Sequence, residues 1–163
     1  MEDAPAIGAL KVRAWRAAYA GFMSRDFLDG LDPPREAGDW AEYLAAIPGT
    51  DRLWVAEEAG SVLGYYRTGP ADGDLDLGPR AAEIYGLYLA PDRVGTGLGR
   101  RLFGHAVADL EERGHRPLCV YAYVPNDRAL RFYERAGFAA DGVTRLDDDD
   151  NIGVTERRLI KPG

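Results

Sequence analysis

The sequence predicts a mixed α/β fold in which helices flank a sheet with at least one parallel connection. Three observations support this prediction. Apolar residues recur at helical spacing up to Ile47, the period changes to that of strands after Asp51, and buried strands alternate with helices from Ala82 onward. A strand, a helix and a second strand in succession indicate a parallel crossover.

The first part of the chain is predicted to hold three helices, at about 5–22, 27–31 and 40–47. In the first, apolar residues recur every three or four positions, as in an amphipathic helix. Ser24 offers an N-cap for the second helix. Pro33-Pro34 is expected to end that helix, because a residue before proline is disfavoured in the helical conformation.

The rest of the chain is predicted to alternate strands and helices. Strands are expected around Leu53–Val55 and Val62–Tyr66, joined by a turn at Glu58-Ala59-Gly60. A loop then covers 69–79. Further strands are expected at about 82–89, 118–124, 138–144 and 154–160, with helices at 97–113 and from Asn126 to Ala136. Gly114 and Gly137 follow these two helices, where terminating glycines are expected.

Length and charge exclude several classes of protein. The 163 residues favour one domain, 1–163. With 20 basic and 27 acidic residues the net charge is −7, so neither nucleic acid nor an anionic membrane is an expected partner. The single cysteine, Cys119, excludes an internal disulfide and fits a reducing compartment. No signal peptide or membrane-spanning run is present, and we expect a cytoplasmic protein.

The most informative segment runs from Arg93 to Arg101, directly between a predicted strand and a predicted helix. Glycines at alternate positions let the backbone turn tightly and let a ligand approach it. The amide groups and dipole of the helix N-terminus favour an anion. Three arginines add positive charge to an otherwise acidic chain. The segment therefore predicts a phosphate or pyrophosphate site.

Two familiar phosphate motifs do not match this segment. A Walker A loop requires Gly-Lys followed by Ser or Thr, whereas Gly99 precedes Arg100-Arg101. A dinucleotide fingerprint requires a third glycine at position 100 and belongs at the first strand of its sheet.

Two stretches resemble the signatures of the GNAT superfamily of N-acetyltransferases. Glu83–Pro91, leading into Gly95–Arg100, is similar to its acetyl-CoA-binding motif. Val120–Phe138, with Asn126, Phe132-Tyr133 and Gly137-Phe138, is similar to the second signature. The resemblance covers 82–138. It implies a twisted mixed sheet splayed between its fourth and fifth strands, with acetyl-CoA as co-substrate in the gap. The first strand is expected to be missing or truncated, because the helical pattern begins at once.

The resemblance also implies roles for matching residues. The backbone of Leu87, Tyr88 and Leu89 would pair with the pantetheine arm, with the Leu89 N–H donating to the thioester oxygen. The pyrophosphate would bind the loop formed by Gly95, Thr96, Gly97, Leu98, Gly99 and Arg100. Asn126 would bond the pantetheine as well as cap its helix. Tyr133, two helical turns beyond Asn126, would protonate the departing thiolate.

The general base is a separate question, because an ammonium group must lose a proton before it attacks. Glu83, at the start of its strand, is the candidate, acting directly or through water. A solvent-exposed strand end, or a pair with Arg80, is the alternative for this carboxylate. The sequence also departs from the family at Val94, where Arg or Gln is usual and where the arginine is displaced to Arg93.

The remaining candidates have structural interpretations. Cys119 is expected to pack in a strand. His105 and His115 have no companion ligands, so no metal is expected. The acidic run 147–150 is expected to be a solvated loop, although its charge would favour a cationic acceptor.

The predicted function is an acetyl-CoA-dependent N-acetyltransferase that moves the acetyl group directly to a primary amine, most simply of a small molecule. A protein acceptor and a homodimer stay open. Two alternatives also stay open: a non-catalytic acyl-CoA-binding sensor or scaffold, and a nucleotide-binding module.

Overall fold

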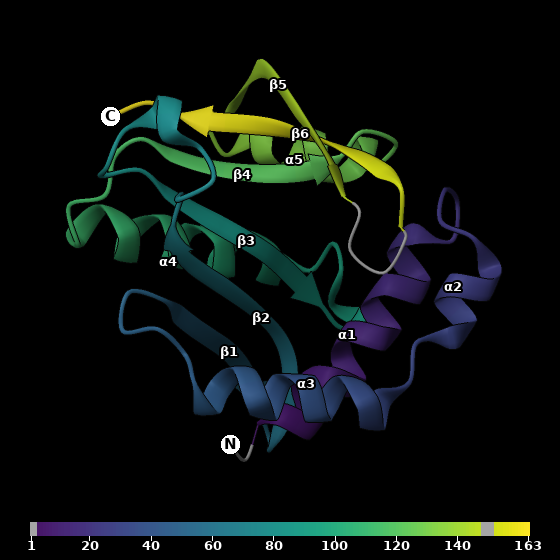
Figure 1. The fold of residues 1–163 in the computed structure, drawn as a ribbon. Helices are drawn as coiled ribbons and strands as arrows, with labels where there is room; N and C mark the ends of the chain where they lie inside the picture. The colour runs from purple at the N-terminus through teal and green to yellow at the C-terminus, as the bar shows by residue number, and fades with distance from the viewer. Residues whose placement is uncertain (1–2, 148–151) are drawn as a thin grey trace. The chain divides into compact units, whose positions relative to one another are not determined.

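Helices and strands follow one another along the chain largely as the sequence predicts (Figure 1). The computed structural model describes residues 3–147 and 152–163. Its helices are α1 (Ala4–Tyr19), α2 (Arg25–Gly30), α3 (Pro33–Ala45), α4 (Leu98–Glu112) and α5 (Asp127–Arg135), with short 3-10 helices η1 (Leu75–Leu77) and η2 (Pro91–Arg93). Its strands are β1 (Arg52–Glu58), β2 (Ser61–Pro70), β3 (Ala82–Leu89), β4 (Leu118–Tyr123), β5 (Ala139–Asp147) and β6 (Val154–Lys161).

The strands form a mixed sheet in the order β1-β2-β3-β4-β6-β5. β3 pairs with β4 in parallel over Ala82–Ile84, and β6 pairs antiparallel with both β4 and β5. The predicted mixed α/β fold and its parallel crossover are therefore confirmed. In the part of the chain that the structure describes, no strand precedes α1, and β1 forms one edge of the sheet.

The chain divides into two compact units, and each unit consists of two separate stretches of the sequence. Unit one comprises residues up to 67 together with 87–103, and unit two comprises 68–86 together with 104–163. The chain passes from one unit to the other within β2, within β3 and within α4. The single domain expected from the chain length stays a prediction.

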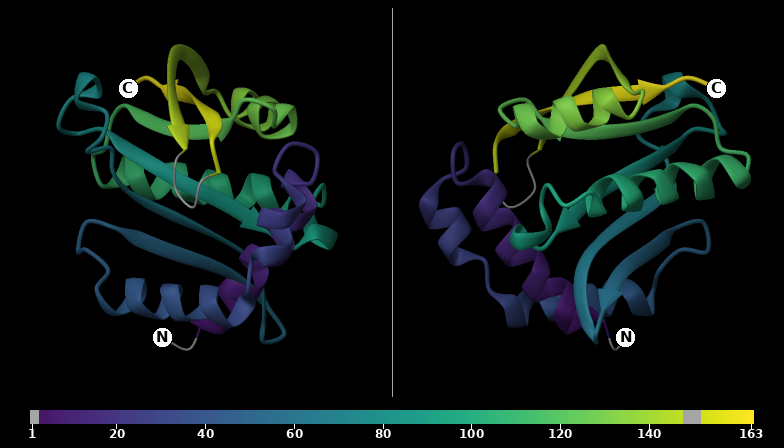
Figure 2. Two further views of the ribbon diagram at one scale, coloured as in Figure 1. Left: turned by 45° about the vertical axis from the view of Figure 1, so that its right-hand side comes forward. Right: turned by 180° about the vertical axis from the view of Figure 1, so that it is seen from behind.

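Unit one is built around α1, α3 and the strands that they cover. Its core includes Ile7 and Leu10 of α1 with Val62 and Tyr65 of β2. α1 passes very close to α3 (Figure 2), because Gly8 has no side chain: a Cβ atom there would lie 2.6 Å from the backbone nitrogen of Ala37.

Unit two contains the first part of β3 with β4, β6 and β5. Leu118, Val120 and Leu159 are fully buried on its central strands. Cys119 lies beside Ala71 and Ala81 and is a free, buried thiol, so the expectation that it packs in a strand is confirmed. Burial raises the pKa of this thiol far above its usual value, which keeps it protonated.

Several predicted boundaries differ from those of the structure: α1 ends at Tyr19 and not at Phe22, and α3 begins at Pro33 and not near Trp40. Pro33-Pro34 does not simply end α2: it opens α3, because proline is tolerated in the first helical turn and Asp32 supplies the N-cap by accepting from Arg35 N–H. The expected loop 69–79 is shorter, since β2 extends to Pro70 and η1 forms within it. Residues 148–150 of the acidic run lie outside the described residues.

None of the helices that the structure describes has the length and apolar character needed to cross a bilayer.

Candidate active site

The glycine-rich loop between η2 and α4 adopts backbone conformations that favour glycine. Gly95 has φ of 84° and Gly97 has φ of 90°, in the left-handed region where a side chain is strained. A Cβ atom at either position would meet no other atom within 4 Å. The glycines are therefore required by the turn, and the space above them is open.

The loop is fixed from within by its threonine. The Thr96 hydroxyl donates to the Arg93 carbonyl oxygen at 2.7 Å, and the Arg93 N–H donates to Ala90 O at 2.8 Å. The first turn of α4 closes with Arg101 N–H donating to Gly97 O at 3.2 Å. The amides of Leu98, Gly99 and Arg100 precede that bond, at the end of the helix where N–H groups lack an intrahelical acceptor.

A cavity of about 340 Å³ opens beside this loop, entirely within unit one. It is lined by Glu58, Leu63, Arg93, Thr96, Gly97, Leu98, Arg100 and Arg101. Three of these residues carry positive charge and one carries negative charge. Open glycines, amides at a helix N-terminus and a net positive lining are the features that bind a diphosphate. The predicted phosphate site thus fits the loop that the structure builds.

The last residues of β3 also belong to unit one. Leu89 packs against β2 at Gly64, where a Cβ atom would lie 2.7 Å from Leu89 Cδ2 and 3.0 Å from the Tyr88 carbonyl oxygen. The Tyr88 ring stacks against Tyr65 at 5.2 Å and Trp15 at 6.2 Å. The segment predicted to bind the pantetheine is therefore held by close packing against Gly64 and by contacts of the Tyr88 ring with two other aromatic rings.

Asn126 directly precedes α5 and Tyr133 lies on it, both in unit two. Asn126 caps this helix, because its Oδ1 accepts from Ala129 N–H at 3.1 Å. Tyr133 is buried, and its ring meets Phe132 at 5.3 Å. Helix capping by Asn126 is thereby confirmed, whereas the roles of both residues toward a cofactor stay predictions.

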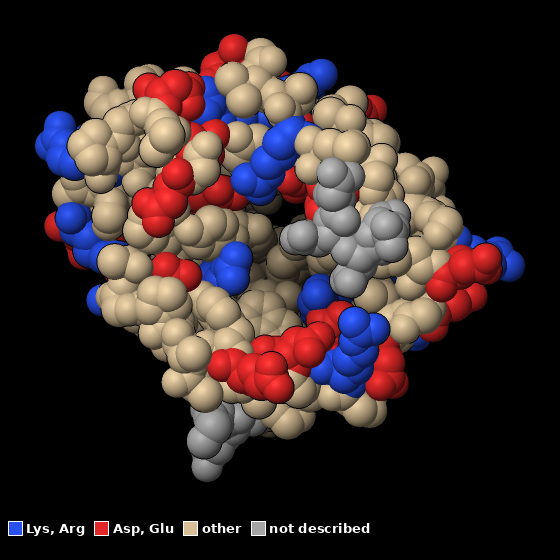
Figure 3. Space-filling view, in the orientation of Figure 1, with Lys and Arg blue, Asp and Glu red and all other residues tan. Residues whose placement is uncertain are grey.

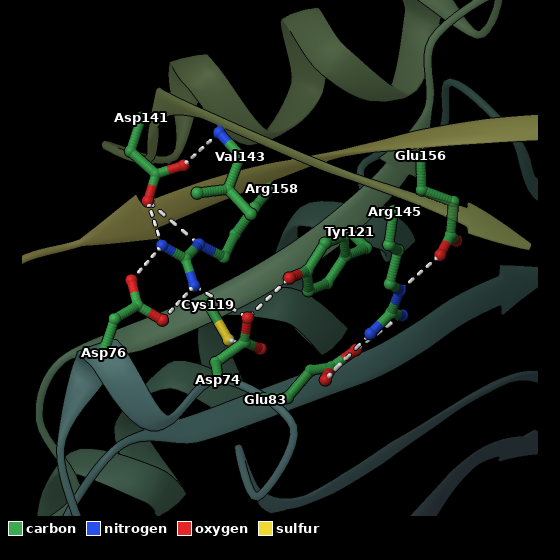
Figure 4. A network of polar contacts seen from close by, with 10 residues as sticks. All are labelled: Asp74, Asp76, Glu83, Cys119, Tyr121, Asp141, Val143, Arg145, Glu156 and Arg158. Atoms are coloured by element: carbon green, nitrogen blue, oxygen red, sulfur yellow. Dashed lines mark hydrogen bonds and ion pairs between the residues drawn. The ribbon is translucent and has the colours of Figure 1, made fainter.

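Glu83 lies in a buried polar network of unit two (Figure 4). Its side chain does not end in solvent, since the residue is 4% exposed. It pairs with Arg145, from Nη2 to Oε1 at 3.1 Å, and not with Arg80. Arg145 is itself held by Glu156 at 2.6 Å and lies 3.5 Å from the centre of the Tyr121 ring.

The position of Glu83 affects its acidity. Burial raises the pKa of its carboxyl group above the usual value, and the charge and hydrogen bonds of Arg145 offset only part of this effect. A raised carboxyl pKa brings a group nearer to the range useful for a general base. The network thus fits the role of general base expected for Glu83.

A second cluster surrounds Arg158, which is 2% exposed (Figure 4). Its guanidinium bonds to Asp74 at 2.7 Å, to Asp76 at 2.5 Å and to Asp141 at 2.6 Å. It joins the segment around η1 to β5 and β6. The Tyr121 hydroxyl donates to Asp74 at 2.6 Å. This cluster links the segment around η1 to β5 and β6 within unit two and leaves its arginine almost entirely shielded from solvent.

Asp74, Glu83 and Cys119 bring one potential metal-ligating atom each within 4.8 Å of one another. Asp74 and Glu83 are already paired with arginines, and the thiol pKa is raised. Metal ions bind the deprotonated forms of such groups, so this arrangement favours internal ion pairing.

Three contributors to these sites were missed by the sequence reasoning. Glu58 and Leu63 line the loop cavity although they lie some 30 positions earlier on a hairpin, and Arg145 reaches Glu83 across 62 positions. Arg93 and Arg101 belong to the segment for which the sequence predicts a phosphate site, although not to the loop residues named for the pyrophosphate, and both line the cavity. The other contacts carry no local signal, since they depend on strand pairing.

Charges of both signs are interspersed on the face drawn in Figure 3. The acidic excess of the sequence is therefore not gathered there into a surface of one sign.

Comparison with known proteins identifies the family of this chain. The model of the Acetyltransferase (GNAT) family matches residues 13–138, and the chain belongs to this family. The matched range contains the glycine-rich loop and both stretches that resemble the family signatures.

The curated relatives are acetyltransferases. A mycothiol acetyltransferase of Cellulomonas flavigena is 37% identical over 139 residues, which cover 80% of this chain and 38% of the relative. One from Propionibacterium freudenreichii is 33% identical over 105 residues, covering 64% and 31%. The chain therefore spans about a third of the length of these relatives. The uncharacterized N-acetyltransferase YuaI of Bacillus subtilis is 27% identical over 164 residues, which cover 100% of this chain and 87% of the relative.

Solved structures share the fold. The PaiA N-acetyltransferase of Thermoplasma acidophilum, in complex with coenzyme A, has a TM-score of 0.71 at 15% identity and covers 96% of this chain and 92% of its own. A GCN5-related N-acetyltransferase of Rhodopseudomonas palustris has a TM-score of 0.75 at 22% identity, covering 99% and 91%.

Proposed function

We propose that this protein transfers the acetyl group of acetyl-CoA directly to a primary amine of a small molecule. The observation that supports the proposal most is the cavity at the glycine-rich loop, with open glycines and three arginines, in a chain of the acetyltransferase (GNAT) family. Acetyl-CoA supplies an activated acetyl thioester, and the acceptor amine is the nucleophile. No acyl-enzyme is required, which agrees with a buried, protonated Cys119.

Binding of the cofactor is proposed for the glycine-rich loop, the last residues of β3 and the residue that caps α5. Amides of the loop from Gly95 to Arg100 would hold the diphosphate, and the Thr96 hydroxyl bond keeps that loop in shape. Backbone groups of Leu87–Leu89 would bind the pantetheine arm as an added strand does. Asn126 uses Oδ1 for its helix, so its side-chain amide group is the donor proposed for the pantetheine.

Chemistry is assigned to three groups. The Leu89 N–H would donate to the carbonyl oxygen as negative charge develops on it. Tyr133 would give its proton to the departing thiolate. Glu83, with its raised pKa, would accept the proton of the acceptor ammonium directly or through water.

A small-molecule acceptor is supported by the relatives that are named as acetyltransferases of mycothiol, a small molecule. The single cysteine supports a reducing compartment, and we propose that the reaction takes place in the cytoplasm.

The experiment is a screen of primary amines for release of free coenzyme A thiol from acetyl-CoA. We expect turnover with at least one small amine. Tyr133→Phe is expected to lower kcat by about 10²-fold or more while coenzyme A affinity is retained. Binding without turnover of any amine, small or on a peptide, would instead identify a non-catalytic sensor.

A further inference from the structure

An ion pair lies within the lining of the loop cavity. Glu58 ends β1 and Arg93 ends η2, and their side chains meet with Arg93 Nη2 at 2.8 Å from Glu58 Oε2. Both residues line the cavity beside the glycine-rich loop. A carboxylate in a site built for an anion requires an explanation, because it opposes the charge that the ligand brings.

Arg93 has a donor to spare. Its Nε is buried and has no hydrogen-bond partner, and the carboxylate oxygen Oδ2 of Asp92 lies 3.6 Å from it. A buried donor left without an acceptor is unfavourable. The backbone of Arg93 is fixed on both sides, by Thr96 at its carbonyl and by Ala90 at its N–H. The guanidinium is therefore held beside the loop with its donor set incompletely used.

The pair with Glu58 is easily exchanged. The Glu58 side chain is 63% exposed and that of Arg93 36% exposed, and such exposed pairs contribute little to stability. A phosphate group offers more acceptor oxygens and more charge than a carboxylate, and it matches the forked donors of a guanidinium.

We propose that Arg93 is a phosphate-binding residue of this cavity, and that a phosphate group of the cofactor replaces Glu58 as its partner. Glu58 then acts as an internal competitor that sets how tightly the cofactor binds. This inference rests on the proposed function, since it assumes that coenzyme A occupies the loop cavity.

The test compares coenzyme A affinity by isothermal titration calorimetry at fixed ionic strength. We expect Arg93→Gln to weaken binding about tenfold, because a charged hydrogen bond is lost. Glu58→Gln is expected to tighten binding about two- to fivefold, because the competing partner of Arg93 is removed. A folding defect cannot produce tighter binding, so the second variant separates exchange from damage.

The double variant Arg93→Gln/Glu58→Gln is expected to bind like Arg93→Gln alone, since Glu58 acts through Arg93. Dephospho-coenzyme A, which lacks the 3′-phosphate, identifies the phosphate that Arg93 binds. If Arg93→Gln loses affinity equally for both ligands, Arg93 binds the diphosphate. If it loses affinity for coenzyme A alone, Arg93 binds the 3′-phosphate. Arg113→Gln, which removes a cation from the ion pair with Asp109 on α4, is the matched control and should leave affinity unchanged.

Two results would overturn the inference when coenzyme A binds the parent protein. One is that Arg93→Gln binds coenzyme A and dephospho-coenzyme A as tightly as the parent protein does. The other is that Glu58→Gln strengthens binding to the same extent in the Arg93→Gln background as in the parent protein. Failure of the parent protein to bind coenzyme A at all would instead overturn the proposed function together with this inference.

Discussion

Glu83 combines opposing influences on one carboxyl group. Burial raises its pKa, and the guanidinium of Arg145 lowers it. The other groups that face Glu83 are the carboxyl groups of Asp74 and Glu156, which raise its pKa further, and the side chains of Cys119 and Tyr121. Arg145 is therefore the residue that limits the rise.

Arg145→Gln tests this arrangement. Without the guanidinium, the pKa of Glu83 should rise further, and the acid limb of the kcat/KM profile should move to higher pH by about 1 unit or more, since a protonated carboxyl cannot accept a proton. The measurement is a pH profile of both proteins with one amine, with Arg113→Gln as control. An acid limb that stays in place in an active variant would show that Glu83 is not the base.

Arg158 is expected to matter for folding. Arg158→Met leaves Asp74 and Asp141 without their buried partner, and we expect a loss of about 3–5 kcal/mol in the free energy of unfolding, measured by urea denaturation. Arg113→Gln should change it by less than about 0.5 kcal/mol. Equal stability of the two variants would contradict the assigned role.

The same cluster gives unit two a dependence on pH. The hydrogen bond from Arg158 lowers the pKa of Asp76. Burial raises the pKa of Asp141, but hydrogen bonds from Arg158 and Val143 N–H bring it below its usual value. Carboxyl groups with lowered pKa values stabilise the fold above their unfolded pKa near 4, and this stability is lost as pH falls through the folded values. Arg158→Met should weaken that acid dependence.

At the scale of elements, the sequence predicted local features well. Asn126 caps α5, and Gly95 and Gly97 take positive φ values in the tight turn that the glycine spacing predicted. Pro33 was misread because proline at a helix start and proline after a helix end have the same local signature. η1 was missed because three residues give no periodicity.

Two glycines in helices should respond to alanine in opposite ways. Gly8→Ala places a methyl group against the backbone of α3, and we expect a loss of about 1–3 kcal/mol in unfolding free energy. Gly38→Ala lies in α3 with open space around it, and should gain about 0.5–1 kcal/mol from reduced chain entropy. Urea denaturation checks both, and a harmless Gly8→Ala would mean that the helices separate without penalty.

At the scale of the whole molecule, ligand binding should be visible as stability. Coenzyme A at 100 times its Kd is expected to stabilise the folded protein by about 2.7 kcal/mol, seen as a rise in Tm. Gly97→Val should keep the fold, because a Cβ atom at this position would meet no other atom within 4 Å. It should show no rise in Tm, because φ of 90° is disfavoured for valine and the loop must change. A normal rise would remove the loop from the binding site.

Long-range pairing set the limit of what the sequence could predict. The ion pairs of Glu83 with Arg145 and of Glu58 with Arg93 join residues 62 and 35 positions apart. Their formation depends on the order of strands and the direction of hairpins, which periodicity does not specify. The chemistry of a loop is local and predictable, whereas the partners that tune it are not.

The alternation of the two units along the chain also governs what a single proteolytic nick would do. A cut between residues 72 and 80 would leave residues 68–71 of unit two on the N-terminal fragment and 87–103 of unit one on the C-terminal fragment. Neither fragment would contain all the residues that form the core of either unit. We expect each to remain unfolded alone, and activity to return only when the two fragments are mixed and reassociate.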